Sequence, residues 1–178
     1  MSSTVFSRAT SSQRSRVDRV TILSFRPYSP ADAAGCLALF DSNVPAFFAA
    51  SERAEYESFL ALPSCPYLVG HLQDGIVRAC GGYFIEPDSS STGGLAWGIV
   101  DRGWQRRGLG QQLLAVRVVA LRALPLLQDV VISTSQHTEG FYARAGFRTI
   151  HSERDGHAPG IDLVEMRCRL DSLDVAWE

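Results

Sequence analysis

Apolar and polar positions recur along this chain with two different periods, which divide it into short strands and helices. Runs rich in β-branched and aromatic residues, bounded by glycine, proline or aspartate, are typical of strands. Apolar residues spaced three and four apart predict amphipathic helices. The predicted strands cover residues 20–25, 66–72, 75–84, 93–100, 129–134, 147–153 and 161–170. The predicted helices cover residues 30–40, 52–60, 109–124 and 138–145.

Local signals mark several ends of these elements. Ser29 precedes Pro30, which is the arrangement of a helix N-cap followed by proline at the first helical position. Residues 41–43, Asp-Ser-Asn, are expected to interrupt that helix. The Gln-Asp-Gly segment 73–75 predicts a hairpin turn, and Gly146 predicts the end of the last helix.

The predicted order of elements is β-α-α-β-β-β-α-β-α-β-β. It contains one β-α-β crossover in its middle, and the other connections favour antiparallel neighbours. The pattern therefore indicates a mixed α/β, or α+β, layered fold, and it excludes a doubly wound parallel sheet. We find no internal repeat.

Composition adds a division into a core and two ends. The 178 residues, 46% of them hydrophobic, fit a single globular domain, which we place at residues 20–170. Residues 1–19 hold six serines and four arginines against one acid, so we expect a flexible extension; a transit peptide or a start codon assigned too early are alternatives. Residues 171–178 are expected to form a C-terminal tail, in which Trp177 is a candidate contact for a partner.

Charge and residue counts exclude several classes of function. All 17 basic residues are arginine, so chemistry that needs a lysine amine is not available. The formal net charge of −2 argues against nucleic-acid binding, and no apolar run approaches the roughly 20 residues that span a membrane. The four cysteines and four histidines match no metal motif, so we expect no metal, reduced thiols and a cytoplasmic protein.

The segment 100–110 is the strongest candidate for chemistry. Gly108 and Gly110 allow the backbone to approach a ligand closely where a strand leads into a helix. The free N–H groups of that helix start favour an anion. Arg102, Arg106 and Arg107 add three positive charges nearby. These features predict a phosphate or pyrophosphate site that needs no lysine.

Two motifs then indicate a family. Gln105-x-x-Gly108-x-Gly110 resembles the Q/R-x-x-G-x-G/A signature of the GNAT N-acetyltransferases. About 30 residues later, residues 141–147 resemble the F-Y-x-x-x-G-F element of the same family. The resemblance covers residues 20–170. It implies a mixed central sheet whose fourth and fifth strands, here 93–100 and 129–134, splay apart around acetyl-CoA, with helices on both faces.

The resemblance also implies cofactor contacts. Backbone groups of Ile99 and Val100 would pair with the pantetheine arm. Backbone amides around the glycine loop would hold the pyrophosphate, at residues Gln105, Arg106, Arg107, Gly108, Leu109, Gly110 and Gln111. Arg107 or Arg144 would reach the 3′-phosphate. Ser135 stands where many members have a cofactor-contacting asparagine, and it could equally serve as a helix cap.

By the same resemblance, the reaction is direct transfer of an acetyl group to a primary amine of a small molecule, an amino acid or a peptide N-terminus. Tyr142 matches the tyrosine that gives a proton to the leaving thiolate. Strand 94–100 lacks the carboxylate that many members use as a base, so Glu86 is the first candidate for the base. Other candidates for the base are Asp41, His137, Glu139 and a water chain.

The loop between the first two helices is expected to contact the acceptor. The candidate acceptor residues are Asp41, Asn43, Phe47 and Trp97. We expect a monomer or homodimer without a nucleic-acid or membrane partner. The alternative function is a catalytically weak acyl-CoA-binding sensor or regulatory module, which the missing carboxylate favours. A toxin-like acetylase of charged tRNA is disfavoured by the acidic core of the chain.

Overall fold

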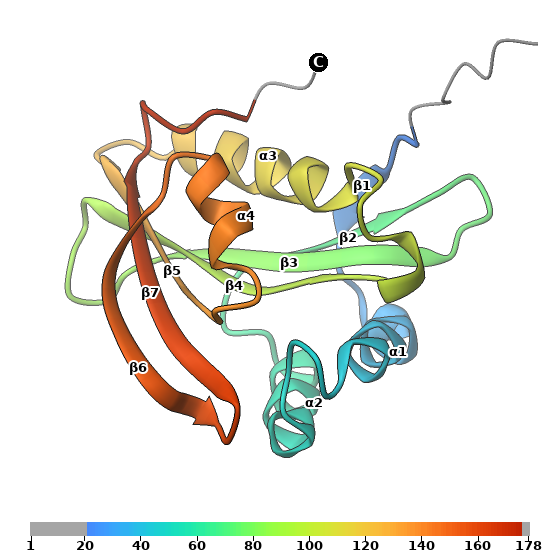
Figure 1. The fold of residues 1–178 in the computed structure, drawn as a ribbon. Coiled ribbons are helices and arrows are strands. Elements are labelled where there is room, and N and C mark those ends of the chain that lie inside the picture. Colours follow the sequence, from blue (N-terminus) through green and yellow to red (C-terminus); the bar gives the residue numbers. More distant parts are fainter. Residues whose placement is uncertain (1–20, 176–178) are drawn as a thin grey trace, which may run out of the picture.

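The computed structural model describes residues 21–175 and contains one seven-stranded mixed sheet. The strands lie in the order β1-β2-β3-β4-β5-β7-β6 (Figure 1). Their bounds are β1 Ser24–Pro27, β2 Tyr67–His71, β3 Val77–Ile85, β4 Thr92–Val100, β5 Asp129–Thr134, β6 Arg148–Ala158 and β7 Ile161–Arg169. The α-helices are α1 Ala33–Asn43, α2 Arg53–Ala61, α3 Leu109–Arg122 and α4 Glu139–Arg144. Short 3-10 helices are η1 Pro30–Asp32, η2 Ala50–Glu52 and η3 Arg102–Trp104.

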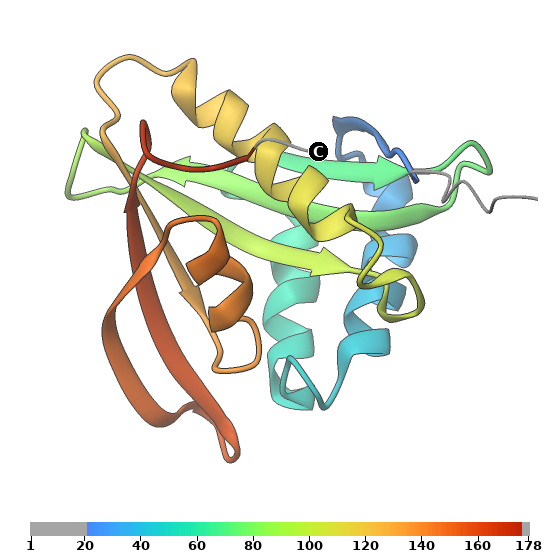
Figure 2. The same cartoon turned by 45° about the horizontal axis from the view of Figure 1, so that its top comes forward.

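The helices cover the two faces of the sheet, as predicted. Helices α1 and α2 pack on one face and α3 on the other, with α4 beside β5 and β7 (Figures 1 and 2). Each face has its own buried core. Phe40, Tyr56 and Val69 represent the core under α1 and α2, and Leu114 and Met166 represent the core under α3 and α4. The α/β fold class is therefore confirmed.

Strands β4 and β5 form the predicted parallel crossover, and they separate along their length. Their register pairs Thr92 with Asp129 at one end and Leu95 with Ile132 at the other. Beyond that point β5 pairs only with β7, through Ser133 and Thr134, while β4 continues on β3. Figure 2 shows the two strands diverging from their paired ends. The expected splay is thus present, and it opens beyond the Leu95–Ile132 pair.

Several boundaries differ from the prediction. Helix α1 continues to Asn43, because the side chains of Ser42 and Asn43 both donate to the Leu39 carbonyl and so hold the last turn closed. Strand β1 begins later than predicted, at Ser24, and β6 extends to Ala158. The predicted extension 1–19, the start of the first predicted strand at residue 20, and Trp177 lie outside the described residues.

Residues 171–175 follow the last strand and are anchored to the domain. Leu173 is buried in the α3–α4 core. The Arg122 guanidinium on α3 donates to the carbonyls of Leu170 and Leu173, at 2.9 Å each from Nη2. The Asp174 N–H donates to the Ala145 carbonyl at 3.2 Å. This part of the predicted tail therefore closes the end of the α3–α4 core.

A buried carboxylate joins β1 to the start of the first helical segment. Asp32 is 7% exposed and accepts hydrogen bonds from both terminal nitrogens of Arg26, at 2.6 and 2.7 Å. It also accepts from the N–H and hydroxyl of Ser29. The Arg26 guanidinium, with help from Ser29, lowers the pKa of Asp32 to about 2. The ionised form therefore stabilises the folded state.

We expect Asp32→Asn to lower the free energy of unfolding by about 1–2 kcal/mol at neutral pH. The folded state binds the Asp32 proton less tightly than the unfolded state. This contribution is therefore complete above the ordinary pKa of 3.8, and it is lost as the pH falls toward about 2. Urea unfolding from neutral pH to pH 2 measures it. In Asp41→Asn, where the lost pair with Arg53 is exposed, stability should change by less than about 1 kcal/mol. Equal losses in both variants would contradict the assignment.

Candidate active site

A cleft of about 900 Å³ opens where β4 and β5 part. It is continuous from the start of α3, along β4, to the loop that joins α1 and α2. Most of the predicted site residues lie on it. These are Asn43, Phe47, Trp97, Ile99, Val100, Gln105, Arg106, Gly108, Gly110, Gln111, Ser135 and Tyr142.

Strand β4 carries a β-bulge in the wall of this cleft. Its register with β3 pairs Ala96 with Gly82 and Ile99 with Cys80, so Trp97 and Gly98 together oppose Gly81. Trp97 has a φ of +43°, a left-handed conformation that residues other than glycine rarely adopt. The bulge turns this segment of β4 out of the regular ladder, beside the gap that leads to β5.

A chain of buried hydroxyls holds the bulge in place. The Tyr67 hydroxyl donates to the Trp97 carbonyl at 3.0 Å, and the Tyr56 hydroxyl lies 2.8 Å from that of Tyr67. In a trans peptide the carbonyl and the following N–H point in opposite directions. The Gly98 N–H therefore points away from Tyr67, and Gly98 lines the cleft.

The ladder between β3 and β4 decides which backbone groups of β4 are free to meet a ligand. The Asp101 N–H donates to the Arg78 carbonyl at 2.9 Å, and hydrogen-bonded pairs alternate along an antiparallel ladder. By this alternation Ile99 exchanges its hydrogen bonds with Cys80, and Val100 directs its N–H away from β3. The backbone contact that was expected from Ile99 is thus already used within the sheet.

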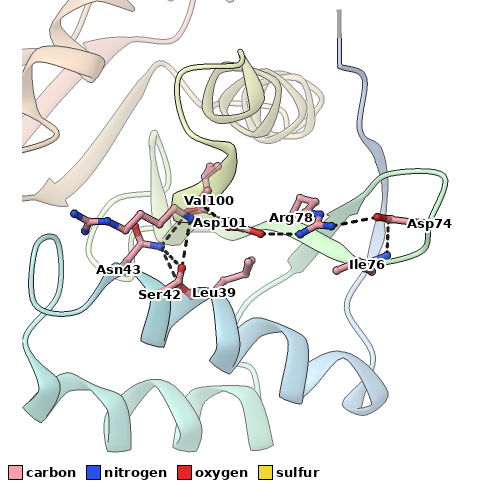
Figure 3. Close-up of polar contacts among 10 residues, drawn as sticks. Leu39, Ser42, Asn43, Asp74, Ile76, Arg78, Val100 and Asp101 are labelled. Atoms are coloured by element: carbon pink, nitrogen blue, oxygen red, sulfur yellow. Dashed lines mark hydrogen bonds and ion pairs between the residues drawn. The ribbon is translucent and has the colours of Figure 1, made fainter.

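Asn43 links the end of α1 to the end of β4 by hydrogen bonds (Figure 3). Its Nδ2 donates to the Leu39 carbonyl at 2.8 Å and to the Val100 carbonyl at 2.9 Å. Its Oδ1 accepts from Nε2 of Gln105 at 2.9 Å. Asn43 is 2% exposed. Its side chain therefore connects three segments and positions the loop between β4 and α3; its predicted contact with the acceptor stays a prediction.

The loop from β4 to α3 is shaped to bind an anion. Arg106 and Gly108 both have a positive φ, of +61° and +79°, which folds the loop over the first turn of α3. Arg106, Gly110 and Gln111 line the cleft there. The free N–H groups of a helix start attract negative charge. The predicted Leu109 is 1% exposed, so only its backbone is in a position to serve such a site.

Two guanidinium groups lie over the ring of Trp104. The Arg78 and Arg107 guanidinium carbons lie 4.9 and 4.7 Å from its ring centroid, distances that give favourable cation–π contacts. Arg78 is in turn held between Asp74 and Asp101, at 3.2 and 2.9 Å (Figure 3). Arg107 does not line the cleft, but its stacking keeps a positive charge beside the loop.

On the other wall, α4 presents Tyr142. This residue is 6% exposed, lines the cleft, and packs edge-on against Phe141 and Phe147 at 4.9 and 5.5 Å between ring centroids. Ser135 also lines the cleft. Its carbonyl accepts the N–H groups of Thr138 and Glu139 at the start of α4, so its backbone closes the helix.

The far half of the cleft is aromatic and acidic. Phe47, Phe48 and Trp97 contribute rings, and Glu52 and Glu55 contribute carboxylates. Glu55 is exposed and has no hydrogen-bond or ion-pair partner among residues 21–175. The sequence analysis did not predict these two glutamates. They are a pair of acids three residues apart, directly after the loop expected to meet the acceptor, and this spacing could have indicated them.

Two predicted residues lie away from the cleft. Asp41 forms an exposed ion pair with Arg53 at 2.8 Å. Glu86 lies in the turn between β3 and β4, where its N–H donates to the Thr92 carbonyl. Neither lines the cleft, so neither is placed to take a proton from a bound amine. His137 and His157 line it instead; His137 was a predicted alternative and His157 was not.

Comparison with known proteins agrees with this geometry. The acetyltransferase (GNAT) domain model matches residues 76–170, which is more than half of the chain. The chain belongs to the GNAT acetyltransferase family. It is accordingly an acyltransferase, and its acyl donor is acetyl-CoA. Comparison with curated protein sequences gives no significant match.

Solved structures share the fold at low identity. A GNAT-family protein from Desulfovibrio desulfuricans is 23% identical, with a TM-score of 0.71 over 84% of this chain and 99% of that one. The yncA protein of Salmonella typhimurium, solved with its cofactor acetyl-CoA, is 17% identical, with a TM-score of 0.62 over 89% and 99%. The ribosomal-protein-alanine N-acetyltransferase of Brucella melitensis is 18% identical, with a TM-score of 0.64 over 83% and 99%.

Residues 21–175 contain neither a candidate metal cluster nor a candidate membrane span. No group of three or more histidine, cysteine, aspartate or glutamate residues lies close enough together to hold a metal ion. No helix in this range is long and apolar enough to cross a membrane.

We expect Asn43→Ala to weaken acetyl-CoA binding, because it releases Gln105 and the end of β4 together. The free energy of unfolding should fall by about 1–3 kcal/mol, and the Kd for acetyl-CoA should rise roughly tenfold. Calorimetric titration and thermal unfolding measure both quantities. Ser42→Ala is the control, since it removes a neighbouring hydroxyl and leaves the Asn43 contacts to Val100 and Gln105 in place. An unchanged Kd in Asn43→Ala would exclude the positioning role.

Proposed function

We propose that this GNAT enzyme transfers an acetyl group from acetyl-CoA directly to a primary amine of a small molecule, an amino acid or a peptide N-terminus. The observation that carries the proposal is the continuity of the cleft. One cleft is lined by the loop between β4 and α3, the β4 bulge, Tyr142 and the half that carries the aromatic and acidic side chains. Donor and acceptor can therefore meet beside the bulge without leaving the protein.

The donor half fits an extended, phosphorylated ligand. We assign the backbone amides from Arg106 to Gln111 to the pyrophosphate, because they lie at the start of α3, where Arg106, Gly108, Gly110 and Gln111 line the cleft. The Val100 N–H, which points away from β3, is available to a pantetheine amide in the manner of an added strand. The Gly98 N–H is directed away from Tyr67 and serves as a hydrogen-bond donor for the thioester oxygen.

Two proton transfers complete the reaction. Acetyl-CoA supplies an activated acyl carbon, and its sulfur leaves as a thiolate that needs a proton. Tyr142 lies on the cleft wall with its hydroxyl engaged by no hydrogen bond among residues 21–175, and we assign it as the acid. The attacking amine must lose a proton, and an ordinary alkylamine is protonated at neutral pH.

We assign His157 as the base that receives the amine proton. Its Nε2 lies 3.0 Å from the Thr134 carbonyl. A carbonyl only accepts hydrogen bonds, so Nε2 carries a hydrogen, and in the neutral ring Nδ1 then keeps a free lone pair. This tautomer is the form in which a histidine accepts a proton. It replaces Glu86, which lies outside the cleft.

The acceptor half favours a cationic amine. Glu52 and Glu55 lie one helical turn apart at the start of α2, and both face the cleft. Phe48 and Trp97 pack at 6.2 Å between ring centroids and offer an apolar wall. A ligand with an alkyl or aromatic body and a positive charge besides the reacting amine would use both features.

We expect Tyr142→Phe to lower kcat about 100-fold, because the leaving thiolate loses its proton donor. The KM for acetyl-CoA should stay within about threefold, since the ring is retained. Thioester consumption with a panel of amines measures both constants. Tyr83→Phe, which removes a hydroxyl from a residue that does not line the cleft, should behave as wild type. Tight acetyl-CoA binding without turnover of any amine would favour a binding module over an enzyme.

We expect Glu55→Gln to discriminate between acceptors. The KM for a diamine should rise about two- to fivefold, while the KM for a monoamine of equal chain length should stay constant. Glu57→Gln is the matched control, because Glu57 lies on the same helix, pairs with Arg53 and does not line the cleft. An equal effect on both amines, or an equal effect of Glu57→Gln, would show that Glu55 does not select the charge.

A further inference from the structure

Arg117 is an unusual group to find at the base of the cleft. It lies on α3, is 1% exposed, and is among the largest fully buried side chains. Its Nε donates to the Leu113 carbonyl at 3.0 Å, one turn earlier on the same helix. Its Nη1 is buried without a hydrogen-bond partner, and no carboxylate pairs with it within residues 21–175. The cleft lining includes Arg117.

Two glycines on neighbouring strands make room for the guanidinium. A Cβ atom at Gly98 would lie 3.1 Å from Nη1 and 3.2 Å from Nη2, and a Cβ atom at Gly81 would lie 3.0 Å from Nη1. Gly81 and Gly98 face each other across the β4 bulge. The guanidinium is therefore seated directly against the bulge, on the side of the sheet that α3 covers.

A buried charge without a counter-charge is costly, and proteins commonly pair or neutralise such groups. Arginine does not lose its proton in proteins, so neutralisation is not open to it. The guanidinium contacts Gly98, whose N–H we assigned to the thioester oxygen. An anion that forms at this point of the cleft would supply the missing counter-charge, and it would do so only during the reaction.

We propose that Arg117 stabilises the negative charge that develops at the acyl-transfer point, first on the thioester oxygen and then on the departing sulfur. This inference rests on the proposed function of the same cleft. The amine nitrogen forms a bond to the acyl carbon and the carbon–sulfur bond breaks. The electron pair goes to sulfur, Tyr142 supplies the proton there, and the base takes the amine proton. Arg117 transfers no atom and acts through its charge.

Cys80 is the rival partner for this charge, since it lies beside Gly81 on the opposite face of the sheet. Burial raises the pKa of the Cys80 thiol, whereas a hydrogen bond with Cys36 and the charge of Arg117 lower it. A thiolate at Cys80 would supply a negative charge that balances the guanidinium without any ligand. Cys80→Ser removes this ionisable group while keeping a hydrogen-bonding side chain, so it separates the two explanations.

The test compares Arg117→Met with Arg117→Lys and with Arg122→Met. Arg122 lies on the same helix, outside the cleft, and holds the carbonyls of Leu170 and Leu173. We expect Arg117→Met to lower kcat by about 10- to 100-fold with little change in the KM for acetyl-CoA. Its Tm should equal or exceed that of wild type, because an unpaired buried charge has been removed. Arg117→Lys, which keeps a charge, should recover most of the kcat.

A second measurement needs no acceptor amine. Ultraviolet absorbance titration gives the thiol pKa of bound CoA, with the desulfo-CoA complex subtracted to remove the protein's own cysteines. Arg117→Met should raise this pKa by about one unit relative to wild type. Arg122→Met should lower the Tm, leave the kcat of the folded enzyme unchanged, and leave the thiol pKa of bound CoA unchanged. Cys80→Ser should leave kcat within about twofold.

Three results would overturn the proposal. One is an unchanged kcat and thiol pKa in Arg117→Met. Another is a fall in kcat that comes with a lower Tm and is explained by partial unfolding of the variant. That result is expected if Arg117 only supports the structure. The third is an equal loss in Cys80→Ser. If wild type transfers acetyl to no amine, the proposed function fails, and the thiol pKa of bound CoA still decides the role of Arg117.

Discussion

The peptide between Trp97 and Gly98 is the point on which the rest of the site depends. The Tyr67 hydroxyl holds its carbonyl, and this fixes the direction of the next N–H. The bulge forms because two residues of β4 oppose the single Gly81 of β3. If this peptide turned over, the Gly98 N–H, which we propose as the donor to the thioester oxygen, would point toward Tyr67 instead of away from it. The hydroxyls of Tyr56 and Tyr67 are buried. The Trp97 carbonyl accepts the hydrogen bond of the Tyr67 hydroxyl, so the two buried hydroxyls have the partners that buried polar groups need.

The arginines make different kinds of electrostatic contact in this fold. Arg107 and Arg78 stack on Trp104 beside the anion loop, and Arg122 ties the last described residues to α3. Arg117 alone among these four lines the cleft. A planar guanidinium can stack on a ring or bridge two carbonyls, which an ammonium does poorly. The absence of lysine from the chain is therefore compatible with the contacts described above for the fold and for the loop from β4 to α3.

Donor and acceptor halves differ in how they are built. The half that we propose for the donor consists of backbone groups of β4 and the α3 start, so it depends on main-chain geometry that Asn43 and the bulge maintain. The half that we propose for the acceptor consists of Trp97 on β4 and, for the rest, of side chains of the α1–α2 connection and α2 that lie off the sheet. Those side chains can change without disturbing the sheet, which explains how one fold serves many acceptors.

The amino-acid sequence by itself determined the element order, the crossover and the glycine-containing turn before α3, and it singled out Tyr142 as a candidate. Each of these follows from local signals: periodicity, helix caps, and glycines at fixed spacing. Only the tertiary structure decided which other side chains meet in the cleft. It moved Asp41 and Glu86 away, assigned Asn43 to a positioning role, and brought in Glu52, Glu55, His157 and Arg117. The bulge that turns Gly98 toward the cleft and the parting of β4 from β5 depend on strand register and long-range packing. Those contacts join residues far apart along the chain, and no local pattern records them.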